Sequence, residues 1–115
     1  MNNDEVTSVS KLASIELTAN KDVKKGEKVT IESLFAYVER RKEFEVPSDI
    51  KRGDIKIKVD ISKVGALETK SDTTKKKGEK TSLVALLSYL DLRKELTATG
   101  DVKKGDKLTV NIETV

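Results

Sequence analysis

Four short loops contain the residue types in this sequence that are best suited to binding chemistry. Each places basic residues directly before a glycine: DVKKGEK begins at Asp22, DIKRGDIK at Asp49, TKKKGEK at Thr74 and DVKKGDK at Asp101. Ammonium and guanidinium groups bind phosphate oxygens, so the loops form a candidate polyanion-binding site. Its nine basic residues are Lys24, Lys25, Lys51, Arg52, Lys75, Lys76, Lys77, Lys103 and Lys104.

Charge balance favours a plainer interpretation of these loops as solvated turns. Each carries acids of its own, such as Asp22 and Glu27 in the first, and we expect these carboxylates to cap the turns. The whole chain has 23 basic and 20 acidic residues, a net charge of +3, with 3% aromatic residues and no Trp. Dedicated nucleic-acid binders have a more one-sided charge and more stacking side chains. Nucleic-acid binding therefore stays the alternative.

Other sites are disfavoured by the residue inventory. The chain has no His and no Cys, which removes the commonest general base and the thiolate chemistry. Gly78-Glu79-Lys80-Thr81-Ser82 lacks the glycine that a phosphate-binding P-loop needs directly before its lysine. The loop acids lack the dense oxygen spacing of a calcium-binding loop. We expect no enzyme activity, no catalytic residue, no cofactor and no metal site.

The location of the protein is only broadly indicated. The amino terminus MNNDEVTSVSK lacks the basic and apolar regions of a signal peptide, and the longest apolar run, residues 83–87, is far shorter than a membrane span. We expect a soluble protein that is cytoplasmic or virion-associated, with no membrane partner.

An internal duplication organises the chain. Shifting the sequence by 52 residues places Lys24-Lys25-Gly26-Glu27-Lys28 on Lys76-Lys77-Gly78-Glu79-Lys80, and the match continues through the following segment. The sequence therefore predicts a flexible N-terminal segment, 1–11, and a single domain, 12–115, made of the repeats 12–63 and 64–115. In each loop the glycine is expected to have a positive φ.

Hydrophobic periodicity predicts the elements that would position the loops. Helices over 30–43 and 83–92 are predicted by apolar stripes at helical spacing: Ile31, Leu34, Phe35 and Val38 in the first, and Leu83, Leu86, Leu87 and Leu90 in the second. The second helix is expected to be the more buried. Tyr37 and Tyr89 occupy equivalent helix positions and are expected in the core or at its rim. Alternation predicts strands over 55–61 and 108–112, with weaker strands over 13–17 and 66–69 and a turn at 63–65.

These elements are α+β in class and fold most simply as a ferredoxin-like βαββαβ sheet with both helices on one face. An alternative takes 28–31 and 44–46 as extra strands and interlocks the two halves into a pseudo-twofold barrel. The segments VTIES and GDIKIKV are similar to parts of cradle-loop barrels, which include AbrB-like DNA-binding domains. This resemblance implies a cradle-loop-type β-barrel.

The possible functions are ranked by excluding those for which the sequence lacks the necessary residues. The first expectation is a non-catalytic structural, assembly or protein-binding module, self-associating or accessory in the manner of a phage virion component, a comparison by analogy only. Its contacts would use aliphatic side chains such as Leu12, Val23, Val64 or Val102. The second is a nucleic-acid-binding module that uses the Lys-rich loops, and an enzyme ranks last.

Overall fold

The computed structural model describes residues 10–54 and 56–115, which form an α+β fold built mostly from strands with a few short helices. Residues 1–9 of the expected N-terminal segment, and Ile55, lie outside the described residues. Strand β2 begins at Ser10, two residues before the expected start of the domain. No helix in the described part of the chain is long and apolar enough to cross a membrane.

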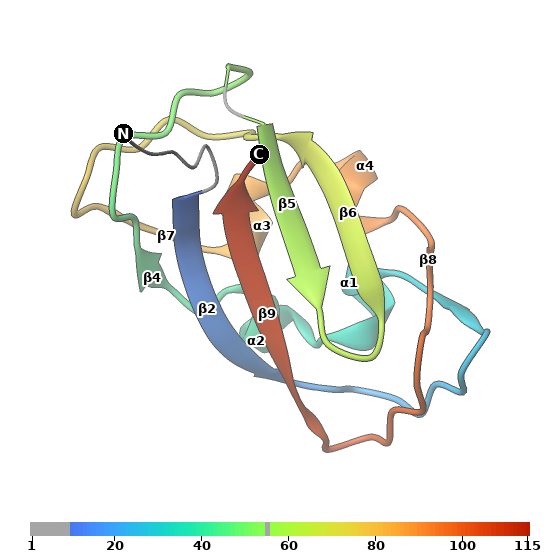
Figure 1. The fold of residues 1–115 in the computed structure, drawn as a ribbon. Helices are drawn as coiled ribbons and strands as arrows, with labels where there is room; N and C mark the ends of the chain where they lie inside the picture. The colour runs from blue at the N-terminus through green and yellow to red at the C-terminus, as the bar shows by residue number, and fades with distance from the viewer. Residues whose placement is uncertain (1–9, 55) are drawn as a thin grey trace, which may run out of the picture.

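The largest element is a four-stranded antiparallel sheet. Its strands lie in the order β2 (Ser10–Thr18), β9 (Lys107–Thr114), β5 (Lys56–Ile61) and β6 (Gly65–Lys70), as Figure 1 shows. The alternating segments 13–17, 66–69 and 108–112 were predicted correctly as strands. The expected turn between the halves is also present, because a hairpin turn joins β5 to β6 with Lys63 at φ 66°.

The alternation of side chains explains why the sheet forms. In β5 every second residue, Ile57, Val59 and Ile61, is buried, and β9 buries its aliphatic residues in the same way. The period of two places these side chains on one face of the sheet, toward the core. The helices lie behind the sheet in Figure 1 and cover this face.

The prediction of two long helices is wrong. Each is two single turns instead: α1 (Ile31–Leu34) and α2 (Tyr37–Arg40) in the first half, α3 (Leu83–Leu86) and α4 (Tyr89–Leu92) in the second. The breaks fall at Phe35 and Leu87, whose backbones are extended and whose side chains are fully buried. Burial of these two large side chains outweighs the helical hydrogen bonds lost at the break.

Short strands connect the first half of the chain with the second. β3 (Lys28–Val29) pairs with β8 (Leu96–Thr97), and β4 (Phe44–Glu45) pairs with β7 (Lys80–Thr81). The alternative prediction placed extra strands over 28–31 and 44–46, where β3 and β4 lie. A four-stranded antiparallel sheet is present, as predicted, whereas the two continuous helices of the ferredoxin-like prediction are not.

Candidate functional site

The four Lys-rich loops meet in two pairs. Loop pair 1 joins residues 22–27 to 101–106, where the backbones of Val23 and Val102 exchange hydrogen bonds of 2.8 and 2.7 Å. Loop pair 2 joins 49–54 to 74–79, where Ile50 and Lys75 exchange bonds of 2.7 and 2.8 Å. In Figure 1 pair 1 lies at the lower right and pair 2 at the upper left. The nine basic residues are therefore divided between two distant sites.

The acids of the loops are used inside the loop pairs. Asp101 accepts a hydrogen bond of 2.9 Å from the backbone N–H of Lys25, and Asp49 accepts one of 2.8 Å from Lys77. Further backbone N–H groups of the loops donate to the carboxylates of Asp22, Glu27, Glu79 and Asp106. The four loop glycines have φ between 78° and 96°, as the sequence predicted. Turn capping by the acids, also predicted, is confirmed.

The basic side chains do not converge on a common point. All are exposed except Lys75, which is half-buried. In loop pair 2 the ammonium of Lys51 lies 3.6 Å from Asp54, and the guanidinium of Arg52 lies 3.6 Å from Asp72. The basic residues of loop pair 1 have no ion pair with any described residue: Lys24, Lys25, Lys103 and Lys104. Each pair mixes both signs of charge.

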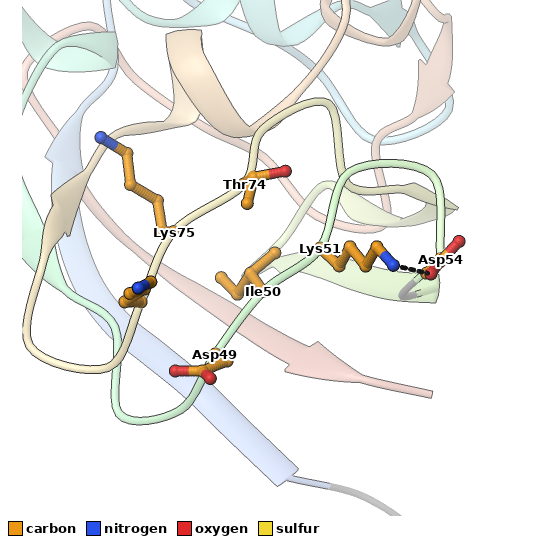
Figure 2. Close-up of a pocket in the computed structure, with 7 residues that line it drawn as sticks. Asp49, Ile50, Lys51, Asp54, Thr74 and Lys75 are labelled. Carbon is orange, nitrogen blue, oxygen red and sulfur yellow. Dashed lines mark ion pairs between the residues drawn. The ribbon is translucent and has the colours of Figure 1, made fainter.

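A cleft of about 530 Å³ lies over Ile50 in loop pair 2. It is lined by Asp49, Ile50, Lys51, Asp54, Thr74, Lys75 and Lys76. Figure 2 shows Lys51 reaching toward Asp54 while Lys75 points the opposite way. The corresponding cleft of loop pair 1 is only about 140 Å³. The ammonium groups of Lys51 and Lys75 therefore do not converge over the cleft of loop pair 2.

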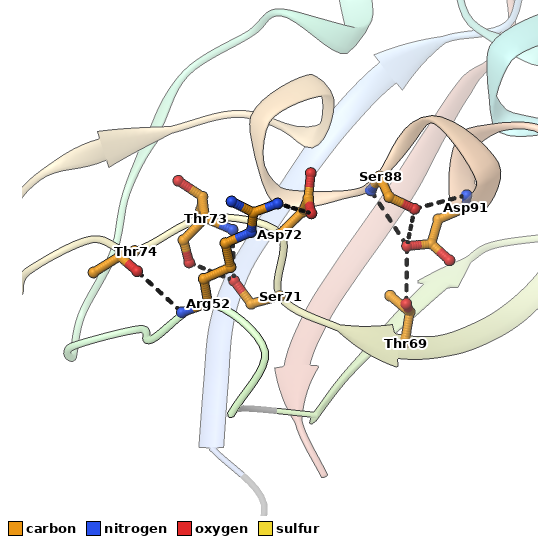
Figure 3. A network of polar contacts seen from close by, with 8 residues as sticks. All are labelled: Arg52, Thr69, Ser71, Asp72, Thr73, Thr74, Ser88 and Asp91. Carbon is orange, nitrogen blue, oxygen red and sulfur yellow. Dashed lines mark hydrogen bonds and ion pairs between the residues drawn. The ribbon is translucent and has the colours of Figure 1, made fainter.

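A network of hydroxyls and carboxylates fixes the segments beside loop pair 2 (Figure 3). Thr74 accepts the backbone N–H of Arg52 at 3.1 Å, and the buried Ser71 hydroxyl donates to the Thr73 carbonyl at 2.8 Å. The carboxylate of Asp91 accepts hydrogen bonds from the hydroxyls of Thr69 and Ser88, both at 2.8 Å. These contacts satisfy polar groups locally. In the described part of the chain, no cluster of three His, Cys, Asp or Glu side chains is placed to hold a metal ion.

Two exposed apolar pairs are the most unusual surface feature. Patch 1 is Tyr37 and Val38 in α2, 56% and 68% exposed; patch 2 is Tyr89 and Leu90 in α4, 62% and 78% exposed. The two patches are related by the same 52-residue shift as the loops. Exposed apolar groups rimmed by polar residues are a feature of protein interaction sites.

Arginine guanidinium groups lie over both tyrosines. Those of Arg40 and Arg41 lie 5.5 and 5.3 Å from the ring centroid of Tyr37, and that of Arg93 lies 5.1 Å from that of Tyr89. Such contacts attract a cation to the ring face by about 0.5–1 kcal/mol at exposed sites. Each patch thus combines an aromatic ring, an aliphatic side chain and a cation.

Carboxylates anchor the two patches to opposite edges of the sheet. Glu39 of α2 accepts the backbone N–H of Thr18 in β2 at 2.7 Å, and Asp91 of α4 accepts the hydroxyl of Thr69 in β6. The hydrogen bond from Thr18, aided by Lys42, lowers the pKa of Glu39. Since β2 and β6 are the outer strands, the patches lie at opposite edges of the sheet.

Sequence reasoning placed these residues wrongly. Val38 and Leu90 were expected on the buried stripes of long helices, and both are exposed because the chain breaks before α2 and α4. One local signal could have revealed the second break. Ser88 and Asp91 form a capping box, the pattern of a helix that starts afresh at Ser88.

The aliphatic residues expected to contact a partner lie in the core instead. Leu12, Val23, Val64 and Val102 are all buried, so none is available on the surface. Val23 and Val102 are buried because they lie where the two loops of pair 1 hydrogen-bond to each other. These four side chains therefore stabilise the fold and do not form a contact surface.

A second cleft, of about 460 Å³, lies beside patch 1 and is lined by Val38, Arg41, Glu43 and Ser82.

Comparison with family models, with curated proteins and with solved structures finds no match to this chain.

Proposed function

We propose that this chain is a non-catalytic protein-binding module that bridges its partners through patches 1 and 2. The observation that carries the proposal is the matched exposure of Tyr37 with Val38 and of Tyr89 with Leu90. Tyrosine and arginine are enriched among the residues that dominate binding energy at protein interfaces. The patches combine both types with an aliphatic side chain.

The location of the patches supports a bridging role. Glu39 and Asp91 anchor them beside the two outer strands, so they do not form one continuous surface. Two equivalent contact surfaces on one chain hold two partners at once, and repeated use of such contacts builds an assembly. The partners are other proteins or further copies of this chain.

We also propose that the fold arose by duplication and is a pseudo-twofold barrel of the cradle-loop type. Support comes from contacts that recur after a shift of 52 residues: Lys25 donates to Asp101, and Lys77 donates to Asp49. In each contact one half of the chain binds the other. Interlocking of this kind favours the barrel over a simple sheet covered by helices.

Nucleic-acid binding remains the second candidate, and the geometry favours it less. The basic residues are divided between loop pairs 1 and 2, and both pairs also contain carboxylates. A non-catalytic role is supported by the absence of His and Cys from the sequence.

The decisive experiment compares protein capture by the immobilised wild type and by a V38S/L90S variant, using an extract of cells that produce the protein. The variant should lose the captured proteins, because it removes the most exposed aliphatic side chain of each patch. An A85S variant is the matched control, since Ala85 is exposed but lies outside both patches. Identical capture by the wild type and V38S/L90S would overturn the proposal.

Size-exclusion chromatography with light scattering and absorbance identifies the class of partner. A mass that rises with concentration in the wild type but not in V38S/L90S would show that the partner is another copy. The chain has two Tyr and no Trp, so bound nucleic acid would dominate the absorbance at 260 nm. A 260 nm signal that salt removes would favour the nucleic-acid alternative.

A further inference from the structure

We infer that the cleft beside patch 1 binds a short peptide segment of a partner protein in which one carboxylate residue is flanked by aliphatic residues. This inference rests on the proposed protein-binding function and specifies its ligand. The cleft is lined by Val38, Arg41, Glu43 and Ser82 and measures about 460 Å³. Ligand pockets measure roughly 300–1,000 Å³, so the space is large enough for a short peptide segment.

The first argument is that Arg41 has no carboxylate partner. Among the described residues its guanidinium contacts only the ring of Tyr37, at 5.3 Å. The equivalent residue 52 positions later, Arg93, lies 3.8 Å from the carboxylate of Glu32 and also donates to the hydroxyl of Tyr89 at 2.8 Å. The residue that corresponds to Glu32 in the other half is Val84, which cannot pair with a cation.

The second argument is that Ser82 also lacks a partner. It precedes α3 and is 8% exposed, yet its hydroxyl makes no hydrogen bond with any described residue. Its counterpart Thr30 is fully used, since the Thr30 hydroxyl accepts the backbone N–H of Ser33 at 3.1 Å. Two polar side chains that have protein partners in one half thus have no carboxylate or hydrogen-bond partner among the described residues in the other, and both line the cleft.

These groups specify the ligand. The guanidinium of an arginine binds a carboxylate through two parallel hydrogen bonds, and a serine hydroxyl can donate a third. Val38, which is 68% exposed, offers apolar contact to a neighbouring aliphatic side chain. The carboxylate of Glu43 repels a second acid in the cleft and accepts a peptide N–H instead. A single acid among aliphatic residues fits all four lining residues.

The test is a titration of the ¹⁵N-labelled full chain with acetyl-leucyl-aspartyl-leucine amide, followed by amide chemical shifts. Saturable shifts are expected at Val38, Arg41 and Ser82. The asparaginyl counterpart, which has the same shape without the charge, should bind at least about tenfold more weakly, as expected for loss of a charge-assisted contact. Inorganic phosphate should not compete.

Variants in the two halves provide matched controls. R41A should lower the affinity for the aspartyl peptide at least about tenfold, and S82A should lower it less, because a neutral hydrogen bond is weaker than a charged one. K94A should leave the affinity unchanged, since Lys94 is an exposed cation that lies outside the cleft and both patches. R41K retains the charge but not the planar fork, and should recover only part of the binding. Preserved amide dispersion in each variant shows that the fold is intact.

Three results would overturn the inference: no saturable shift, equal binding of the aspartyl and asparaginyl peptides, or equal losses in R41A and K94A. Competition by inorganic phosphate would assign the cleft to phosphate instead of carboxylate. The proposed function has a separate test: it is overturned when the V38S/L90S variant captures the same proteins as the wild type. Capture that depends on Val38 and Leu90, together with a peptide that does not bind, would overturn only the ligand assignment.

Discussion

Replacement of Thr81 by valine should stabilise the protein. Thr81 lies in β7, opposite Phe44, and is 3% exposed. Its hydroxyl oxygen is fully buried and has no hydrogen-bond partner among the described residues. The equivalent position of the first half, 52 residues earlier, is occupied by Val29, which is 4% exposed in β3. One half therefore carries a valine where the other carries an unsatisfied threonine.

The size of the effect follows from the cost of burying a hydroxyl. Mutational data place the penalty for a buried polar group without a partner at about 1–3 kcal/mol. Valine has nearly the same shape as threonine, so T81V removes the penalty without opening a cavity. We expect the free energy of unfolding to rise by about 1–2 kcal/mol, which shifts the Tm by about 4 °C per kcal/mol in a domain of 115 residues.

Urea unfolding followed by circular dichroism measures this change. T81V should move the midpoint to higher urea without altering the slope, since the surface exposed on unfolding is unchanged. The reverse variant, V29T, buries a new hydroxyl in the equivalent strand and should lose about as much stability as T81V gains. A T81V protein that unfolds at lower urea would refute the reasoning, because it would show that the hydroxyl is hydrogen-bonded in solution.

Three further predictions test the contacts that hold the fold together. The hydrogen bond from Thr18 lowers the pKa of Glu39 in the folded protein from 4.5. The ionised Glu39 therefore stabilises the fold above pH 4.5, and this stabilisation is lost as the pH falls through the lowered pKa. E39Q should flatten the acid limb of a plot of Tm against pH. D49A and D101A should each cost about 1 kcal/mol in urea unfolding through loss of a loop-capping bond, and the double variant should cost the sum because the loop pairs are distant. Gly65 has φ 124°, so G65A should lower the free energy of unfolding by about 1–3 kcal/mol, and an unchanged urea midpoint would contradict this assignment of strain.

Much of the local structure could be predicted from the sequence alone. Strict alternation in 108–112 and in the segment before Ile61 specified strands, because a period of two places all aliphatic residues on one face. The glycines of the Lys-rich loops specified turns with positive φ, since only glycine adopts that conformation without strain. These features depend on neighbours in the sequence, and local patterns report them directly.

The helices show where local periodicity is misleading. Residues 31, 34, 35 and 38 have the spacing of a helix face, yet Phe35 is extended and Val38 is exposed. The spacing is compatible with one long helix or with two turns separated by a buried extended residue. Contacts from elsewhere in the chain decide between them: Phe35 forms a β-bridge with Ala19, and the Leu34 carbonyl accepts the backbone N–H of Asn20.

The candidate sites depended on tertiary structure most of all. The sequence identified the nine basic residues of the loops, but not that residues 22–27 meet 101–106 while 49–54 meet 74–79 at another site. It identified Tyr37 and Tyr89 as equivalent, but not as exposed. Composition and spacing thus determined which groups the chain carries. Closure of the whole chain around one core decided which of them meet, because contacts between distant segments form only when the complete sheet is assembled.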